Sequence, residues 1–227
     1  MSITTDARNL QPTLPVWGLL GRTLLVALGN VLIVPAPWTA TYFSKFLTDH
    51  VTLPDGKRLR FTGQARDIWY IFVAIAALPW IQGLAEHGGH PRHLGLLWGV
   101  AIAALSVRVF KWFCANLKSE GDRLALSFEG RYWPYIGWYV LLMVSFITIV
   151  GWAWVVRYMM RWICQNVRGT ASFDFTASGW EILWRTLVAG LLGILIIPFP
   201  WTHRWYVNWI ISQITVVETD GPISASS

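Results

Sequence analysis

Lys111-Trp-Phe-Cys-Ala-Asn-Leu-Lys118 and Arg161-Trp-Ile-Cys-Gln-Asn-Val-Arg168 are two copies of one motif, with basic, Trp, Cys, Asn, aliphatic and basic residues in register. Each copy ends a long apolar run. Two further copies are centred on Pro35-Ala-Pro-Trp-Thr39 and Pro198-Phe-Pro-Trp-Thr202. An internal repeat predicts equivalent supersecondary units, each of which buries one face against its neighbours.

Overlaying the four copies gives columns of related residues. The columns are Trp38, Ala104, Trp154 and Trp201; Lys45, Lys111, Arg161 and Asn208; Phe46, Trp112, Trp162 and Trp209; and His50, Asn116, Asn166 and Gln213. Arg22-Thr-Leu24 and Arg185-Thr-Leu187 precede the first and fourth copies at equal distance. The sequence therefore predicts a fourfold repeat.

Composition indicates a membrane protein, because 55% of the residues are hydrophobic, 13% are charged, and the apolar residues form blocks. A helix that is apolar on all sides over about 18 or more residues is typical of a membrane span. The blocks are Val16–Val34, Ile68–Ala85, Leu94–Leu117, Trp133–Val150 with a continuation through Val167, and Trp180–Ile197.

Each repeat is interpreted as a helical hairpin, because Pro35, Gly151 and Pro198 interrupt the apolar runs and proline ends or restarts a helix. We expect an all-α polytopic membrane protein with about six transmembrane helices, or up to eight. Amphipathic helices in the first and fourth repeats would lie in the interface. Short β-turn hairpins, rich in Asp-Gly and Glu-Gly-Asp, would separate the repeats.

The expected organisation is one membrane domain over residues 16–217, with repeats at about 16–66, 67–131, 132–179 and 180–217. Residues 1–15 form a flexible polar segment without the features of a signal peptide, and residues 218–227 form a flexible tail. The loops that separate the repeats are predicted to face the cytoplasm, because they are richer in Lys and Arg than the Glu86–His93 loop, which holds only Arg92. The net charge of +6 then reflects topology and anionic lipid, and does not indicate nucleic acid binding.

Cations within the apolar runs are the residues that favour a function, because a charge there must pair, snorkel or line a polar cavity. Arg22, Arg108, Arg157 and Arg185 lie within or next to these runs, and Arg22 and Arg185 are interpreted as snorkelling side chains. The candidates for binding a lipid headgroup or an anion are Lys45, Lys111, Arg157, Arg161 and Arg204. Asp49, Asp67 and Glu181 are the nearest acidic residues that could pair with these cations.

Three further groups have both a structural and a functional interpretation. Gly95, Gly99 and Ala103 form a stripe for close helix packing, either within this chain or against another subunit. His87, His90 and His93 could bind zinc or copper, although a solvated loop is the preferred interpretation. Cys114 and Cys164 occupy equivalent positions and are read as small packing residues, rather than a disulfide or a metal pair.

The repeat resembles the YjgN-like family of bacterial membrane proteins, a family of unknown function. The resemblance rests on Pro-Trp, a basic and aromatic pair such as Arg157-Tyr158 or Arg204-Trp205, then Asn166, and a turn leading to Phe61-Thr-Gly63 or Phe128-Glu-Gly130. It covers the chain from about Trp17 to Val217. The first copy departs from the pattern, the second lacks Pro-Trp, and the fourth ends without Phe-x-Gly. The resemblance implies a bacterial inner-membrane location and no known activity.

The sequence has no nucleophile elbow, P-loop or paired-carboxylate pattern, and we expect neither an enzyme nor a cofactor. The preferred hypothesis is a non-catalytic membrane protein that packs against lipids or a larger membrane complex as an accessory subunit. A small transporter or channel that uses the basic column is the first alternative. A metal-dependent membrane enzyme that uses the histidine loop is the second.

Overall fold

A computed structural model describes residues 8–88, 94–121, 124–195 and 197–217, and this part of the chain is mostly helical. Its α-helices are α1 (Val16–Leu32), α2 (Ala36–Asp49), α3 (Trp69–His87), α4 (Leu94–Ala115), α5 (Tyr132–Ser145), α6 (Trp152–Gln165), α7 (Gly179–Ile194) and α8 (Phe199–Ser212). Two short 3-10 helices are η1 (Ala65–Asp67) and η2 (Phe146–Thr148). The strands are β1 (Arg8–Asn9), β2 (Gln11–Pro12), β3 (Val51–Thr52), β4 (Leu59–Phe61), β5 (Leu117–Ser119), β6 (Leu126–Phe128), β7 (Val167–Gly169), β8 (Ser172–Phe175) and β9 (Ile214–Val217).

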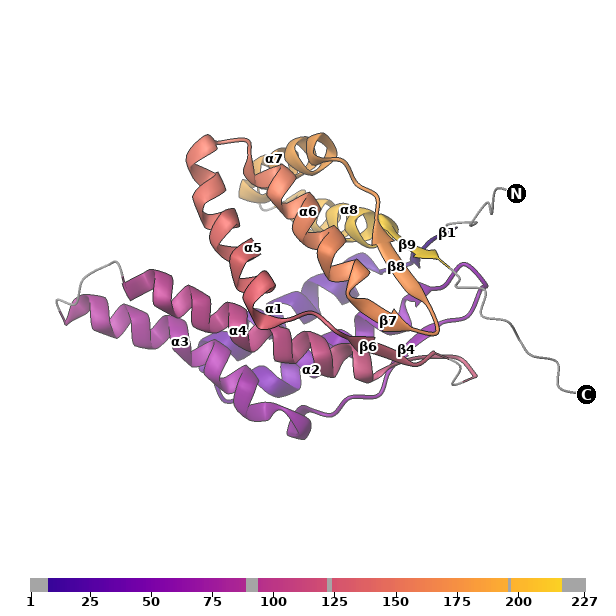
Figure 1. Ribbon diagram of the computed structural model, residues 1–227, viewed down its shortest axis with the longest axis horizontal. Coiled ribbons are helices and arrows are strands. Elements are labelled where there is room, and N and C mark those ends of the chain that lie inside the picture. The colour runs from indigo at the N-terminus through magenta and orange to yellow at the C-terminus, as the bar shows by residue number, and fades with distance from the viewer. Residues whose placement is uncertain (1–7, 89–93, 122–123, 196, 218–227) are drawn as a thin grey trace, which may run out of the picture.

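Consecutive α-helices pack as four helical pairs, α1 with α2, α3 with α4, α5 with α6, and α7 with α8. These four pairs, numbered first to fourth, splay outward from the side of the molecule where the strands gather (Figure 1). The first pair contacts the second, the second contacts the third, and the third contacts the fourth. Helix α8 also packs against α1, so the contacts between the four pairs form a closed circuit.

Each helical pair is closed at its base by the two strands that flank it in the sequence. Strand β2 pairs antiparallel with β3, β4 with β5, β6 with β7, and β8 with β9. Strand β1 extends the last of these ladders by pairing with β9. The strand that enters a helical pair is therefore bonded to the strand that leaves it.

This pairing differs from the expected hairpins between repeats. The strands of each ladder lie before and after a helical pair, and not on the two sides of a short loop between pairs. Between the first and second pairs a local turn does form at Asp55–Gly56, where an isolated bridge joins Thr52 to Arg58. Phe61-Thr-Gly63 follows β4 and so belongs to the second helical pair, although the sequence pattern placed it at the end of the first. Strand pairing is a long-range choice that the local turn residues do not determine.

The column of His50, Asn116, Asn166 and Gln213 corresponds to one structural position, the residue that follows the second helix of each pair. The carbonyl oxygen at this position accepts a hydrogen bond from a backbone N–H just after the entering strand. The donors are Thr13 (2.8 Å), Thr62 (2.9 Å), Glu129 (2.9 Å) and Thr176 (3.0 Å), respectively. A carbonyl left open by the end of a helix thus finds its partner in the base of the same helical pair.

The aromatic column, Phe46, Trp112, Trp162 and Trp209, lies one turn before those carbonyls and packs into the base. Trp112 meets the Phe61 ring edge-on at 4.9 Å between centroids, and Trp162 meets Phe128 in the same way at 6.2 Å. A Cβ atom at Gly63 would overlap both Phe61 and Trp112. The glycine of Phe-x-Gly is therefore required because a tryptophan ring occupies the space above it.

The helices begin and end close to the predicted positions, and Pro37 and Pro200 lie in the first turns of α2 and α8. Two helices are long and apolar enough to cross a membrane, Trp69–His87 and the Leu97–Ala115 part of α4. The other α-helices have 14 to 17 residues. At a rise of 1.5 Å per residue they are about 21 to 25 Å long, shorter than the bilayer core of about 30 Å. The expectation of about six spans therefore remains a prediction.

We expect Gly63→Ala to destabilise the protein by about 1–3 kcal/mol, because the new methyl group must displace one of two packed rings, Phe61 or Trp112. Thermal unfolding in detergent measures the effect. Gly83→Ala in α3 is the matched control, since nothing lies within 4 Å of its Cβ position. That substitution should stabilise the helix by about 0.5–1 kcal/mol. Equal effects of the two substitutions would contradict this role for Phe-x-Gly.

Candidate functional site

The ends of the first, third and fourth helical pairs that point away from the strands are apolar and exposed. The side chain of Val34 is 69% exposed at the first tip, Ile147 is 82% exposed at the third, and Ile197 is 84% exposed at the fourth. Leu32, Ile149 and Ile194 are exposed beside them. Soluble monomers seldom expose apolar side chains so densely, and such a surface marks a partner or a membrane.

The backbone at two of these tips bonds internally. Ile33 and Ile149 both have φ of 63°, and a three-residue turn follows at each, with Val34 N–H donating to Leu32 and Val150 N–H donating to Thr148. Such a conformation is costly for a β-branched residue, about 1–3 kcal/mol. It allows the chain to reverse direction while most of the tip's polar groups remain satisfied by the tip itself.

Side chains complete this internal bonding at the third tip. The Thr148 hydroxyl donates to the Ser145 carbonyl at 2.6 Å and accepts from the Gly151 N–H at 3.0 Å. The Trp152 indole N–H donates to the Ile149 carbonyl at 2.9 Å. At the first and fourth tips, Pro35 and Pro198 supply no N–H that would need a partner. These tips are suited to a solvent that offers no hydrogen bonds.

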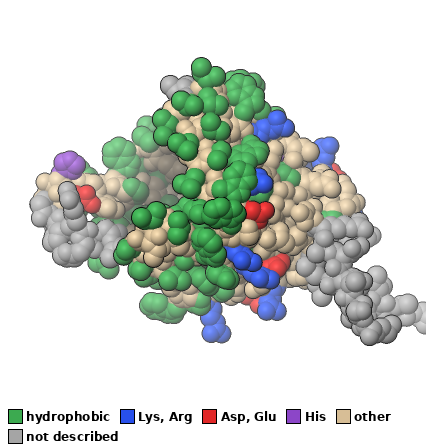
Figure 2. Space-filling model, turned by 90° about the horizontal axis from the view of Figure 1, so that it is seen from above, with side chains coloured by type: hydrophobic (Ala, Val, Ile, Leu, Met, Phe, Trp, Pro, Cys, Tyr) green, Lys and Arg blue, Asp and Glu red, His purple; other side chains and the backbone are tan. Residues whose placement is uncertain are grey.

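Charged residues are absent from long stretches around the same tips. No Lys, Arg, Asp or Glu occurs in residues 23–44, 132–156 or 186–203. In Figure 2, hydrophobic side chains spread widely over the visible face, and the charged ones gather mainly toward one side of it. The first, third and fourth helical pairs are therefore apolar toward their tips and polar toward their strand-closed bases.

The second helical pair is longer and differs at its tip. Helices α3 and α4 have 19 and 22 residues, and α3 ends with the exposed Glu86 and His87. His87 Nδ1 lies 2.7 Å from the Gly83 carbonyl oxygen. His90 and His93 lie outside the described residues. Within the described part of the chain no group of three metal-ligating side chains occurs, and the histidine-loop metal site stays a prediction.

Arg22 and Arg185 occupy matching positions on α1 and α7, and both guanidinium groups stack on aromatic rings of the following helix. Arg22 lies 3.9 Å from the centroid of Phe46 and donates to the Tyr42 hydroxyl at 3.1 Å. Arg185 lies within 4.7 to 5.2 Å of the ring centroids of Trp184, Trp205 and Trp209. Among the described residues, Arg185 has no hydrogen-bond acceptor. The surroundings of Arg22 and Arg185 differ in this respect, because Trp205 stands at the position that matches Tyr42 and has no hydroxyl to accept a hydrogen bond.

The five cations predicted to bind a headgroup are distributed over all four helical pairs, with two of them on the same helix. Lys45 is on α2, Lys111 on α4, Arg157 and Arg161 on α6, and Arg204 on α8. Lys111 lies 5.4 Å from the Tyr132 ring centroid, and Arg157 lies 5.7 Å from that of Tyr158. Lys111, Arg157 and Arg161 each contact a different partner among the described residues, and a shared binding role of the five cations remains a prediction.

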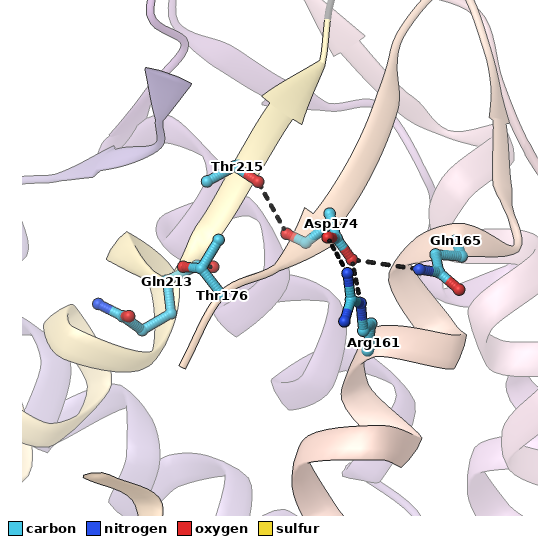
Figure 3. A network of polar contacts seen from close by, with 6 residues as sticks. All are labelled: Arg161, Gln165, Asp174, Thr176, Gln213 and Thr215. Carbon is cyan, nitrogen blue, oxygen red and sulfur yellow. Dashed lines mark hydrogen bonds and ion pairs between the residues drawn. The ribbon is translucent and has the colours of Figure 1, made fainter. Parts of the chain in front are cut away.

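Arg161 joins α6 to the base of the fourth pair through a bidentate ion pair with Asp174 of β8. Its Nε and Nη2 atoms each lie 3.1 Å from a carboxylate oxygen, and Gln165 donates to the same carboxylate at 3.4 Å (Figure 3). Thr215 of β9 donates to the Asp174 carbonyl at 3.3 Å. This network connects a helix of the third pair to the β8–β9 ladder, which indicates a structural role for Arg161.

The small-residue stripe packs within this chain where it is described. Ala103 is buried, and a Cβ atom at Gly99 would overlap the Tyr139 hydroxyl of α5. The surroundings of Gly95 are not described. Cys114 and Cys164 are buried and free, as the packing interpretation expects. Gly99 therefore allows close packing between the second and third helical pairs.

No protein-family model, curated protein or solved structure matches this chain. Function must therefore be argued from the distribution of apolar and charged side chains in the fold.

We expect Asp174→Asn to lower the free energy of unfolding by about 0.5–1 kcal/mol, because the ion pair with Arg161 is bidentate but partly exposed. Arg161→Gln should cost about the same, and the double variant no more than either single one. Chemical denaturation measures all three. Asp55→Asn is the control, since its pair with Lys57 is confined to one exposed turn. Additive losses would show that the two side chains do not act together.

The Asp67 carboxylate predicts a pH dependence at the base of the second pair. Hydrogen bonds from the Gln64 backbone N–H and the Trp112 indole lower its pKa below the usual 3.8. A lowered pKa stabilises the fold above pH of about 4, and this contribution disappears as pH falls through the folded-state pKa. The wild type should therefore lose melting temperature more steeply between pH 5 and 3 than Asp67→Asn. Parallel curves would contradict this.

Proposed function

We propose that the chain is a non-catalytic integral membrane protein that packs against lipids and a larger membrane complex as an accessory subunit. The observation that carries the proposal is the set of exposed, uncharged tips around Val34, Ile147 and Ile197. Transfer of apolar surface out of water is favourable by about 25 cal/mol per Å². A bilayer is the simplest surrounding that covers three separate tips at once.

The insertion depth follows from helix length and charge position. In the first pair, about ten residues separate Arg22 from the tip at Ile33, or about 15 Å of helix. That distance is about half of the hydrocarbon core. We infer that the first, third and fourth pairs enter the membrane part way, while α3 and α4 alone cross it. Six to eight full crossings remain the alternative arrangement.

The four helical pairs are, in this proposal, one fourfold repeat. Support comes from the shared position of His50, Asn116, Asn166 and Gln213 after the second helix of each pair. The bases, rich in Lys and Arg, would face the cytoplasm of a bacterial inner membrane. Membership in the YjgN-like family is part of the same proposal, and rests on the sequence motifs alone.

Transport by the basic column is less favoured. A path for an anion would need Lys45, Lys111 and Arg161 to line one channel, and Arg161 is already paired with Asp174. The exposed apolar surface of the tips is explained by contact with lipid or protein, without a channel. It is a suitable surface for lipid or for the spans of another subunit, which pack through van der Waals contact.

Single cysteine substitutions test how the protein lies in the membrane. Three are at the tips, Val34→Cys, Ile149→Cys and Ile197→Cys. Asp55→Cys is at the base, and Gly88→Cys is at the end of α3. A membrane-impermeant maleimide is added to oriented vesicles from one side or the other. We expect Asp55→Cys to react only from the cytoplasmic side, and Gly88→Cys only from the opposite side. The three tips should react from neither side, because hydrocarbon surrounds them.

The unmodified chain is the labelling control, since Cys114 and Cys164 are buried. Reaction of the three tips from the side opposite Asp55→Cys would replace partial insertion with six to eight crossings. Their reaction from the same side as Asp55→Cys would show that the tips lie in water, and would contradict the membrane proposal. A stoichiometric protein partner after mild detergent extraction tests the accessory role separately.

A further inference from the structure

A pocket of about 550 Å³ lies along α8, and its residues combine aromatic rings with a cation and an amide. Trp201, Trp205 and Trp209 supply the rings, and Arg204 and Asn208 supply the polar groups. Pro12 of β2 closes its end at the base of the first pair. The pocket contains no acidic residue in its lining. It is open to the surface and lies between the charged base and the apolar fourth tip.

The cation that lines this pocket, Arg204, is not paired with a carboxylate of the described residues. Arg204 is exposed and makes no hydrogen bond or ion pair within the described residues. Arg185 stacks on Trp205 and Trp209, and its Nε is buried without a hydrogen-bond partner. Glu181 is one turn away on α7, but it caps its own helix by bonding to Ser178. The Arg204 guanidinium therefore presents N–H donors to the pocket that no neighbouring carboxylate engages.

Asn208 adds a polar group that lacks a partner. Its Oδ1 atom is buried and accepts no hydrogen bond. A buried amide without a partner costs about 1–3 kcal/mol, unless a ligand or water satisfies it. A hydroxyl group is suited to this position, because it can donate to the amide oxygen and can also accept from the amide nitrogen. Asn208 thus points to a ligand with a hydroxyl as well as an anionic group.

We propose that this pocket binds the headgroup of an anionic phospholipid that carries a free hydroxyl, such as phosphatidylglycerol. The Arg204 guanidinium would bind the phosphate, for which its planar set of donors is suited. The headgroup hydroxyl would satisfy the Asn208 amide. Trp201, 54% exposed and one turn from the apolar tip, would lie beside the start of the acyl chains. The inference rests on the proposed membrane location.

Phospholipid is favoured over a free phosphate by the position of the pocket. Its tryptophans lie on the same helix as the uncharged stretch that ends at His203, and Trp17 of α1 packs edge-on against Trp201 at 5.8 Å. These rings are typical of the interface between headgroups and hydrocarbon. A soluble glycerol phosphate would use the arginine and the amide but would leave the rings uncovered.

Native mass spectrometry of the purified chain with defined lipids tests the proposal. We expect phosphatidylglycerol to bind the wild type at least about tenfold more tightly than phosphatidylcholine, which is zwitterionic and has no headgroup hydroxyl. Arg204→Gln should remove that preference. Arg60→Gln, which removes an exposed cation of β4 outside the pocket, is the control and should retain it. Equal loss in both variants, or no preference in the wild type, would overturn the proposal.

Asn208→Leu separates binding from folding. It removes a buried amide without a partner, so the thermal stability of the lipid-free protein should stay equal or rise. Its affinity for phosphatidylglycerol should fall at least about fivefold, with little change for phosphatidic acid, which lacks the hydroxyl. Unchanged affinity for phosphatidylglycerol would contradict the role of the amide. Competition by glycerol phosphate at the same concentration as the lipid would identify a phosphate site instead of a lipid site.

The cysteine-labelling experiment keeps the two proposals apart. If the tips are buried in the bilayer and phosphatidylglycerol shows no preference for the pocket, only the present inference fails. If the tips lie in water, the membrane location fails, whatever the pocket binds.

Discussion

The hydrogen bond that closes the base of each helical pair determines the rest of the fold. A helix ends with carbonyl groups that have no partner within the helix. Here the carbonyl of His50, Asn116, Asn166 or Gln213 accepts a bond from the strand that entered the same pair. Because the bond joins the beginning of a helical pair to its end, the two helices must run out and return. The apolar tips can therefore project freely, with their bases held in place.

Much of this fold could be predicted from the sequence, because its signals are local. Prolines 35 and 198 marked the starts of second helices, and the apolar runs gave helix ends close to those found. The strand partners could not be predicted, since two- to four-residue strands carry almost no pairing signal. Leu59-Arg-Phe61 follows soon after β3, yet its partner is Leu117–Ser119, beyond two helices. Only the tertiary arrangement makes that partner available.

The candidate sites were harder to predict because a sequence column does not imply a spatial cluster. Lys45, Lys111 and Arg161 share one column of the predicted repeat, and each belongs to a different helical pair. Equivalent positions converge only where they face a common axis. The ion pair of Arg161 with Asp174 depends on the packing of β8 against α6. No sequence motif predicts that packing. Arg22 donates a hydrogen bond to Tyr42, whereas Arg185 stacks on Trp205. The sequence shows the exchange of Tyr42 for Trp205 at matching positions, but not these contacts.

The uncharged tips relate the fold to the solvent around it. An irregular turn in hydrocarbon is tolerated only if its polar groups are bonded within the protein. Thr148 and Trp152 bond the backbone of the third tip, and prolines remove donors from the first and fourth. A turn exposed to water would need none of these features, because water would bond the same groups without the strain of φ at 63° in Ile33 and Ile149. The self-contained bonding of the tips is therefore what the proposed membrane location requires of them.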